Sequence, residues 1–250
     1  MELTNWGRTH TSEVVRVARP TDEPGVRVAV AEAAREGRRI RPIGALHSWS
    51  DVAMDDQVAL SLDGLTGVRP LPHGRVAVAA GTRLKDLNTA LDALGLAMPI
   101  LGSVAEQSLA GAVSTGTHGS SVHHGNLAYG VRSARLVKAD GEVLALASDD
   151  PRLDGVRVGL GALGVLTELV VDVVPAFRLA EAATPLPIDE VVEHLPTLAR
   201  AAPYVKIWWL PHTGMAMVYA GAPTSEDSTY SPTGRWIDEQ LVNGAVFAGV

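Results

Sequence analysis

The residues with the clearest chemical potential lie in one short segment, 43–50. It follows a short strand-like run, contains Gly44, and places His47 and Ser48 at its tip. Small residues let backbone N–H groups approach a phosphate closely. A histidine there can serve as a base, a ligand or a nucleophile toward an activated cofactor carbon. The segment predicts an anion-binding loop with a reactive imidazole, and the alternative is a turn histidine bonded to backbone.

A second segment, 101–120, is rich in glycine and hydroxyl side chains. Clusters at 101–103 and 114–120 flank a stretch from Gln107 to Val113 that we expect to be helical. Apolar residues within the segment indicate burial, and buried backbone needs hydrogen-bond partners that a ligand can supply. These features predict contacts to a polyanion such as pyrophosphate. A long surface loop is the alternative.

Two further patterns contain residues typical of a dinucleotide-binding site and of a zinc site, but lack the neighbouring elements or the spacing that those sites need. The turn 159–164 spells G-x-G-x-x-G, yet a nicotinamide dinucleotide site needs a helix after it, and residues 165–174 predict a strand. A turn entering a buried strand is favoured, and a turn passing close to adenine stays open. His118, His123 and His124 match no common zinc spacing. We therefore expect no metal.

The elements that position these loops follow from hydrophobic periodicity. Strand-like runs at 13–19 and 39–43 flank a helical pattern from Asp22 to Gly37, which predicts a βαβ unit with parallel strands. The other elements expected before residue 176 are strands at 58–62 and 75–80, a helix at 82–95 capped by Thr82 with Leu84, Leu87, Leu91 and Leu94 on its apolar face, a hairpin at 131–147 and a strand at 164–174.

The composition shifts after about residue 176. We expect strands at 204–210 and 215–220, and the start of a helix in the last residues. Trp208 and Trp209 alternate along a strand, so one is expected in the core and the other facing a substrate cleft or an interface. The expected helix is 188–201, with Val191, Val192, Leu195 and Leu198 facing inward. About 75 residues follow residue 175, and we expect this region to be incomplete, with exposed apolar surface around Val246 and Phe247 that favours self-association.

Composition excludes several classes of protein. The chain has 250 residues, a net charge of −7 and no cysteine, which excludes disulfides, iron–sulfur clusters and a cysteine nucleophile. No basic surface is evident, so no nucleic-acid partner is expected. No run approaches the roughly 18 apolar residues of a membrane span, and no secretory leader is visible. We expect a soluble, cytoplasmic protein.

Four motifs occur in an order that resembles a known superfamily. They are R-P-I-G-x-x-H-S from Arg41, G-S from Gly102, G-A-V-S-T-G-T-H-G from Gly111 and G-A-L-G-V from Gly161. This order resembles the vanillyl-alcohol-oxidase flavoproteins, which have a PCMH-type FAD-binding domain. Within that superfamily, Asn5-Trp6 and the run W-W-L-P-H-T from Trp208 are similar to the branch of alditol oxidases and aldonolactone (gulonolactone, arabinonolactone) oxidases.

The resemblance implies an α+β fold with FAD as cofactor. Residues 1–175 would form a two-subdomain PCMH-type FAD-binding domain, with subdomains at about 1–70 and 71–175, followed by the start of an α+β substrate (cap) domain at 176–250. His47 would match the histidine bonded covalently to the flavin 8α carbon. The implied cofactor-binding residues are His47, Ile43, Gly44, Ala45, Leu46, Ser48, Gly102, Ser103, Gln107, Gly111, Ala112, Ser114, Gly116, Thr117, His118, Gly119, Gly164, Val165 and Thr167.

The resemblance also implies a reaction. A substrate carbinol carbon would transfer hydride to the flavin, and O2 would reoxidise it; Gly102 matches a position where a small side chain leaves oxygen room. The substrate would be a small alcohol, such as a sugar alcohol, an aldonolactone or a related polyol, with Ser103 touching it. Flavin enzymes acting on sterols, aromatic alcohols or 2-hydroxy acids are alternatives, as are a non-catalytic flavin-binding module and a nicotinamide dehydrogenase.

Two departures from the superfamily pattern matter. Leu46 stands where the loop usually has glycine. Leucine takes a positive φ with difficulty, which predicts either another loop conformation or a less close approach to phosphate. No position matches the acid, arginine and lysine that polarise the substrate in this branch, so no catalytic base is assigned, and we expect a truncated enzyme.

Overall fold

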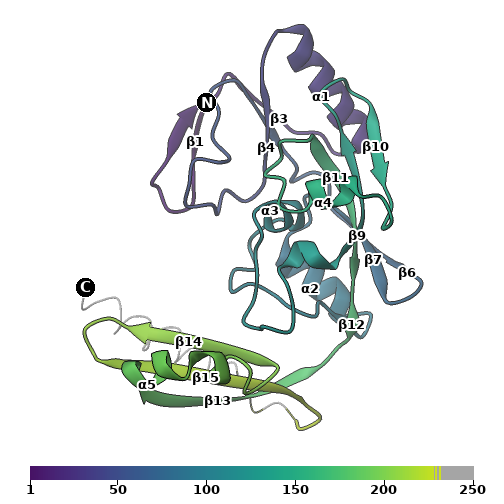
Figure 1. Ribbon diagram of the computed structural model, residues 1–250. Coiled ribbons are helices and arrows are strands. Elements are labelled where there is room, and N and C mark those ends of the chain that lie inside the picture. Colours follow the sequence, from purple (N-terminus) through teal and green to yellow (C-terminus); the bar gives the residue numbers. More distant parts are fainter. Residues whose placement is uncertain (228, 230, 232–250) are drawn as a thin grey trace.

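A computed structural model describes residues 1–227, 229 and 231 (Figure 1). The N-terminal region holds a parallel three-stranded sheet in the order β3-β5-β4, formed by β3 (Arg16–Ala18), β5 (Val58–Ser61) and β4 (Ile40–Ile43). The helix α1 (Glu23–Arg35) connects β3 to β4, which confirms the predicted parallel βαβ unit, with β5 inserted between its strands. A hairpin of β1 (Glu2–Thr4) and β2 (Thr11–Glu13) precedes it.

The boundaries of α1 follow from its end residues. The Asp22 side chain accepts a hydrogen bond from the Gly25 backbone N–H at 2.7 Å, which satisfies one free donor of the first turn. Gly37 lies just beyond the helix with a φ of +66°, a conformation that favours glycine. The helix therefore lies where the sequence predicts.

A five-stranded antiparallel sheet forms the centre of the molecule, in the order β10-β9-β11-β7-β6. Its strands are β6 (Val68–Leu71), β7 (Arg75–Ala79), β9 (Val131–Val137), β10 (Val143–Leu146) and β11 (Val165–Asp172). The predicted hairpin at 131–147 and the strand after residue 164 are confirmed. The strand β6 has no counterpart in the prediction, because its proline and charged residue weaken its strand signal.

Short helices and a small two-stranded sheet surround this central sheet. They are α2 (Leu84–Asp92), α3 (Leu109–Ser114), the 3₁₀ helix η1 (Leu127–Gly130), α4 (Arg152–Val156), β8 (Leu96–Ala97) and β12 (Val174–Pro175). The prediction that Thr82 caps α2 is wrong. Its hydroxyl binds the backbone of Gly67, and the cap position is Arg83, which makes no side-chain cap bond. Leu94 lies beyond α2 and is 47% exposed, so it is not part of the apolar face.

One hydrophobic core joins α1 to the central sheet. Val26 and Val30 of α1 pack in the same buried cluster as Leu169 of β11. At the edge of this core, Glu23 accepts hydrogen bonds from Arg135 at 2.6 Å and from the Thr167 hydroxyl at 2.7 Å. The N-terminal region is therefore fastened to the central sheet by both apolar and charged contacts.

The residues after 177 form a separate antiparallel sheet in the order β13-β15-β14, shown in green to yellow in Figure 1. Its strands are β13 (Arg178–Pro187), β14 (Tyr204–Leu210) and β15 (Met215–Thr224). The predicted helix at 188–201 is instead two short helices, α5 (Ile188–Glu193) and α6 (Leu195–Leu198). Pro196 has no backbone N–H to donate to the carbonyl four residues before it, so a single helix is interrupted, and the proline lies in the first turn of α6, where it is tolerated.

Several predicted inward positions on this sheet are exposed. Val191 is buried, but Val192 and Leu195 are exposed by 66% and 47%. Trp208 and Trp209 are both exposed, by 53% and 60%, so neither lies in the core. The two short helices bury only a small cluster of residues on one face of the sheet, which accounts for these corrections. The expected terminal helix and the apolar surface at Val246 and Phe247 lie outside the described residues.

The C-terminal sheet contacts the glycine-rich segment directly. The Tyr204 hydroxyl donates to the Pro99 carbonyl at 3.0 Å, and the Ser121 hydroxyl donates to the Pro203 carbonyl at 2.6 Å. The backbone N–H of Val205 donates to the Ser120 carbonyl at 2.8 Å. Burial raises the pKa of Tyr204. These bonds place β14 beside the end of the segment that the sequence singles out.

Candidate functional site

The loop after β4 lies against the start of α3. A Cβ atom added at Gly44 would lie 2.4 Å from the Oγ of Ser108, which is closer than real contacts allow. That hydroxyl already accepts a hydrogen bond from the Gly111 backbone N–H at 3.3 Å and so cannot easily move away. Glycine at position 44 is therefore required for the two loops to approach each other.

A cavity of about 100 Å³, open to solvent, lies between these loops and the turn before β11. Ten residues of the predicted set line it, and Ser108, Thr115 and Leu160 line it as well. The ten are Ile43, Gly44, Ala45, Leu46, His47, Ser48, Gln107, Gly111, Ser114 and Gly164. Three segments that are far apart in the sequence thus meet around one space.

Leu46 adopts the left-handed conformation, with a φ of +56°. Leucine thus takes a positive φ, the conformation that favours glycine, and its effect on the approach to a phosphate stays a prediction. This conformation costs roughly 1–2 kcal/mol for an L-residue. The half-buried side chain packs against a small cluster that contains Val14, Ile43 and Ala59, and that packing offsets part of the strain.

A second cavity, of about 590 Å³, also has His47 in its lining. Its lining includes four more residues of the predicted set, together with two tryptophans. The lining residues are Trp6, His47, Trp49, Gly102, Ser103, Val104, Ala105, Glu106, Gln107, Thr117 and His118. His47 and Gln107 line both cavities, so they lie at the junction between them.

Gly102 is closely packed in this second cavity. A Cβ atom there would lie 2.7 Å from the Cγ2 of Thr117. The Thr117 hydroxyl in turn accepts a hydrogen bond from the Gln107 amide at 3.1 Å. Close packing against Thr117 therefore requires a glycine at position 102, in addition to any effect of this residue on access to the cavity.

The remaining predicted residues lie outside both cavities. Ala112 and Val165 are buried in the core, and Thr167 is 5% exposed with its hydroxyl on Glu23. Gly116 has a φ of +69°, and a Cβ at Gly119 would lie 2.4 Å from the Leu101 carbonyl oxygen. These residues shape the loops around the cavities without lining them.

The turn 157–164 closes one side of the first cavity in a strained conformation. Val158 and Leu160 both have a φ of +53° although neither is glycine. The Leu160 carbonyl accepts from Arg41 at 3.3 Å, and its N–H donates to the Ser114 carbonyl at 3.2 Å, so the turn is held by β4 and by the end of α3. The strand β11 follows at once, and the helix that a nicotinamide dinucleotide site needs is not there.

The charges near the second cavity are paired. The Lys85 ammonium binds Glu106 at 2.8 Å and holds the pKa of that carboxyl below its usual value, and the nearby His47 lowers it further by a smaller amount.

Within residues 1–227, 229 and 231, no group of three histidine or acidic side chains is placed to hold a metal ion. No helix in the same residues is long and apolar enough to cross a membrane.

The sequence alone missed Trp6, Trp49 and Ser108 as residues of these cavities. Trp6 is far from the glycine-rich segment in sequence and belongs to the connection between β1 and β2, whereas Trp49 lies two residues after His47 in the loop 43–50. Ser108 carries a recognisable signal, because a serine directly before a helical stretch is a common cap. The positive φ of Val158 and Leu160 has no signal in the residue types.

Two protein-family profiles match most of the chain. Residues 15–147 match the profile of the FAD binding domain, and residues 169–248 match that of D-arabinono-1,4-lactone oxidase. D-arabinono-1,4-lactone oxidase of Eremothecium gossypii is 34% identical over 241 residues, 93% of this chain and 45% of that protein. L-gulono-1,4-lactone dehydrogenase of Mycobacterium tuberculosis is 32% identical over 247 residues, 97% of this chain and 57% of that protein.

Solved structures share the fold. Cholesterol oxidase from B. sterolicum has a TM-score of 0.81 at 19% identity, covering 99% of this chain and 54% of that one. At this identity the likeness shows the α+β fold alone, and that expectation is confirmed. The chain spans about half the length of the curated relatives that it matches.

Proposed function

Because the chain belongs to the FAD-binding-domain family, whose profile covers more than half of its residues, we propose that it binds FAD across the two cavities that meet at His47. The single observation that carries this proposal is the junction itself. The lining of one cavity includes glycines and hydroxyl residues from three segments alongside apolar side chains, and the lining of the other includes two tryptophans and Gly102. The first suits a pyrophosphate and the second a flat ring system.

The residues present fit this cofactor. A Cβ at Gly44 would fill the space between the loops, so the backbone there can approach a bound phosphate closely. Ser48 and Ser114 add hydroxyl donors along the first cavity. His47 lines both cavities, which supports its proposed role as the residue bonded covalently to the flavin 8α carbon. Gly102, Ser103, Thr117 and His118 are the proposed neighbours of the ring system and, for Ser103, of the substrate.

The proposed reaction is oxidation of an alcohol group in an aldonolactone, sugar alcohol or related polyol. Bound flavin supplies the hydride acceptor, and O2 is the proposed final acceptor. The chain's own residues would bind and orient the cofactor and form the wall against which a substrate lies. The names of the relatives, lactone oxidases and a lactone dehydrogenase, support this substrate class.

A substrate panel tests the proposal. The chain, loaded with FAD, is mixed without oxygen with L-gulono-1,4-lactone, D-arabinono-1,4-lactone, xylitol or cholesterol, and bleaching of the flavin absorbance is recorded. Bleaching by a lactone or polyol supports the proposed reaction. Bound flavin that no compound reduces would favour a non-catalytic flavin-binding module. Failure to bind FAD at all would refute the assignment of the cavities.

A further inference from the structure

Two N-terminal residues hold the backbone on both sides of His47. The Trp6 backbone N–H donates to the carbonyl of Leu46 at 2.8 Å. The Asn5 side-chain amide donates to the carbonyl of Ser48 at 3.0 Å. The peptide group directly before His47 and the one directly after Ser48 are therefore both fixed by a segment about 40 residues earlier in the chain.

The orientation of the Asn5 side chain is fully determined by its partners. Its Oδ1 accepts from the backbone N–H groups of Thr9 and His10 at 2.9 and 3.1 Å. Those donors require oxygen on that side, so the NH2 group must face the Ser48 carbonyl and the Thr9 hydroxyl. Asn5 is only 2% exposed, and a buried amide with all its partners satisfied is expensive to disturb.

The indole of Trp6 lies on the imidazole of His47. The ring centroids are 5.5 Å apart and the planes are inclined by 26°, a stacked arrangement. Trp49 meets Trp6 edge-on, with the ring centroids 5.6 Å apart. Gly7 leaves room for this contact, since a Cβ there would lie 2.7 Å from the Trp49 ring.

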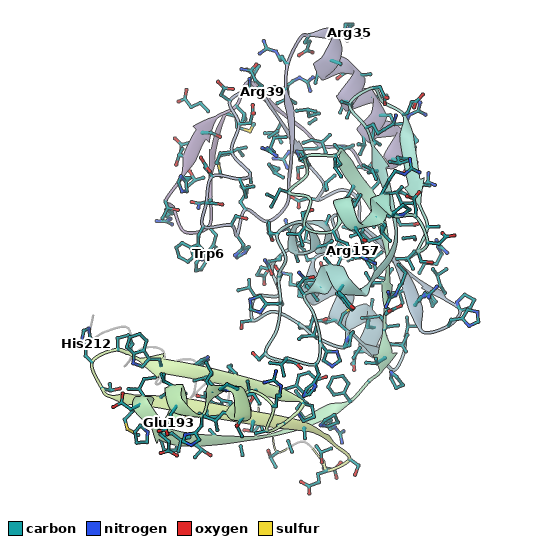
Figure 2. All side chains as sticks on the ribbon, viewed as in Figure 1. Trp6, Arg35, Arg39, Arg157, Glu193 and His212 are labelled. Carbon is teal, nitrogen blue, oxygen red and sulfur yellow. The ribbon has the colours of Figure 1, made fainter. Side chains whose placement is uncertain are left out.

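The Trp6 side chain is largely exposed to solvent although it contacts His47. Trp6 is 62% exposed, and Figure 2 shows it at the end of the N-terminal region that is remote from α1. It also lines the second cavity beside His47. Among the described residues, the His47 imidazole has no hydrogen-bond partner, so the stacked indole is what sets the plane of its ring. Both ring nitrogens remain available for reaction.

We propose that Asn5 and Trp6 are positioning residues that hold His47 for bond formation with the flavin. This rests on the proposed function, in which His47 is the attachment residue. In that step an imidazole nitrogen forms a bond to the 8α carbon. The imidazole N–H and one 8α C–H are lost as protons, two electrons reduce the flavin, and O2 reoxidises it. The hydrogen bonds from Asn5 and Trp6 to the loop backbone, together with the stacked indole, orient the imidazole nitrogen toward the 8α carbon.

The test separates attachment from binding. Flavin-free chain is incubated with FAD, and acid-stable flavin in the precipitate is measured over time, while the dissociation constant is measured by flavin fluorescence at the start. We expect Trp6→Ala to slow attachment by about tenfold, equivalent to about 1.4 kcal/mol, with little change in the initial affinity. Trp6→Phe, which keeps a stacking ring, should retain most of the rate, and Trp209→Ala is the matched control.

A second variant keeps the hairpin bonds. Asn5→Asp retains the acceptor for Thr9 and His10 but places an oxygen against the Ser48 carbonyl, so it should slow attachment as well. Equal attachment rates in Trp6→Ala, Asn5→Asp and the unsubstituted chain would overturn the inference. If Trp6→Ala fails to fold, the attachment rates of Trp6→Phe and Trp6→Leu are compared instead. Only phenylalanine preserves the stacked ring, so equal rates in these two variants would also overturn the inference.

Failure of the proposed attachment at His47 gives a different result from failure of the positioning role. Unsubstituted chain that binds FAD but never forms acid-stable flavin would overturn attachment at His47, and with it this inference, while leaving the cofactor assignment intact. An NMR spectrum gives an independent readout. The ring protons of His47, assigned with His47→Gln, should show an upfield ring-current shift that disappears in Trp6→Ala; its absence in the unsubstituted chain would overturn the stacked arrangement.

Discussion

Position 46 offers a test in which the usual order of two substitutions is reversed. Leu46 has a φ of +56°, a conformation that costs an L-residue roughly 1–2 kcal/mol and costs glycine almost nothing. Leu46→Ala and Leu46→Gly remove the same packing against the Val14 cluster, or nearly so. The difference in stability between these two variants therefore isolates the backbone strain.

The magnitude follows from two opposing effects. At an ordinary position, alanine is more stable than glycine by about 0.4–1 kcal/mol, because glycine has more freedom in the unfolded chain. At position 46 the strain carried by alanine exceeds that effect. We therefore expect Leu46→Gly to be more stable than Leu46→Ala by about 1 kcal/mol.

The assay is unfolding in urea without FAD, followed by circular dichroism. The control is Ala31→Gly at an exposed position in the middle of α1, where glycine should be less stable by about 1 kcal/mol. A Leu46→Ala variant at least as stable as Leu46→Gly would refute the left-handed assignment. In that case the loop takes the different conformation that the sequence suggested.

Three further predictions concern the packing around the site. Gly44→Ala should lower FAD affinity about tenfold or more in a fluorescence titration, because overpacking of 1–3 kcal/mol must be relieved by moving the loop. Gly102→Ala should lower stability by about 1–3 kcal/mol in urea, and adding Thr117→Ser, which removes the Cγ2 atom, should restore it; no recovery would contradict the contact. The hydrogen bond from Arg135 holds the pKa of Glu23 below its ordinary 4.5, so the ionised form stabilises the fold above that pH and this stability is lost as the pH falls below it. Glu23→Gln should therefore be less stable than the unsubstituted chain by about 1 kcal/mol at pH 7, and a difference that persists unchanged in acid would contradict the ion pair.

The N-terminal βαβ unit and the central hairpin were predictable because their signals are local. The helical spacing from Asp22 to Gly37 and the Asp140–Gly141 turn determine structure within a few residues. The strand β13 was not predictable, since alanines and prolines have low strand propensity. Its two prolines are tolerated because β13 is an edge strand of its sheet.

The candidate site was predictable as two loops and not as a complete lining. Gly44, His47 and the segment from Gly102 follow from residue types and order. The positive φ of Leu46 and the stacking of Trp6 on His47 depend on the hairpin that closes over the loop. Such tertiary contacts leave no local pattern in the sequence.

The most direct test of FAD bound at the His47 junction is an absorption spectrum taken before and after acid precipitation. The purified chain is incubated with FAD, freed of excess cofactor, and compared with His47→Ala. We predict a flavin spectrum whose yellow colour stays with the acid precipitate, and its release into the supernatant in His47→Ala. A chain that remains colourless after incubation with FAD would contradict the central claim.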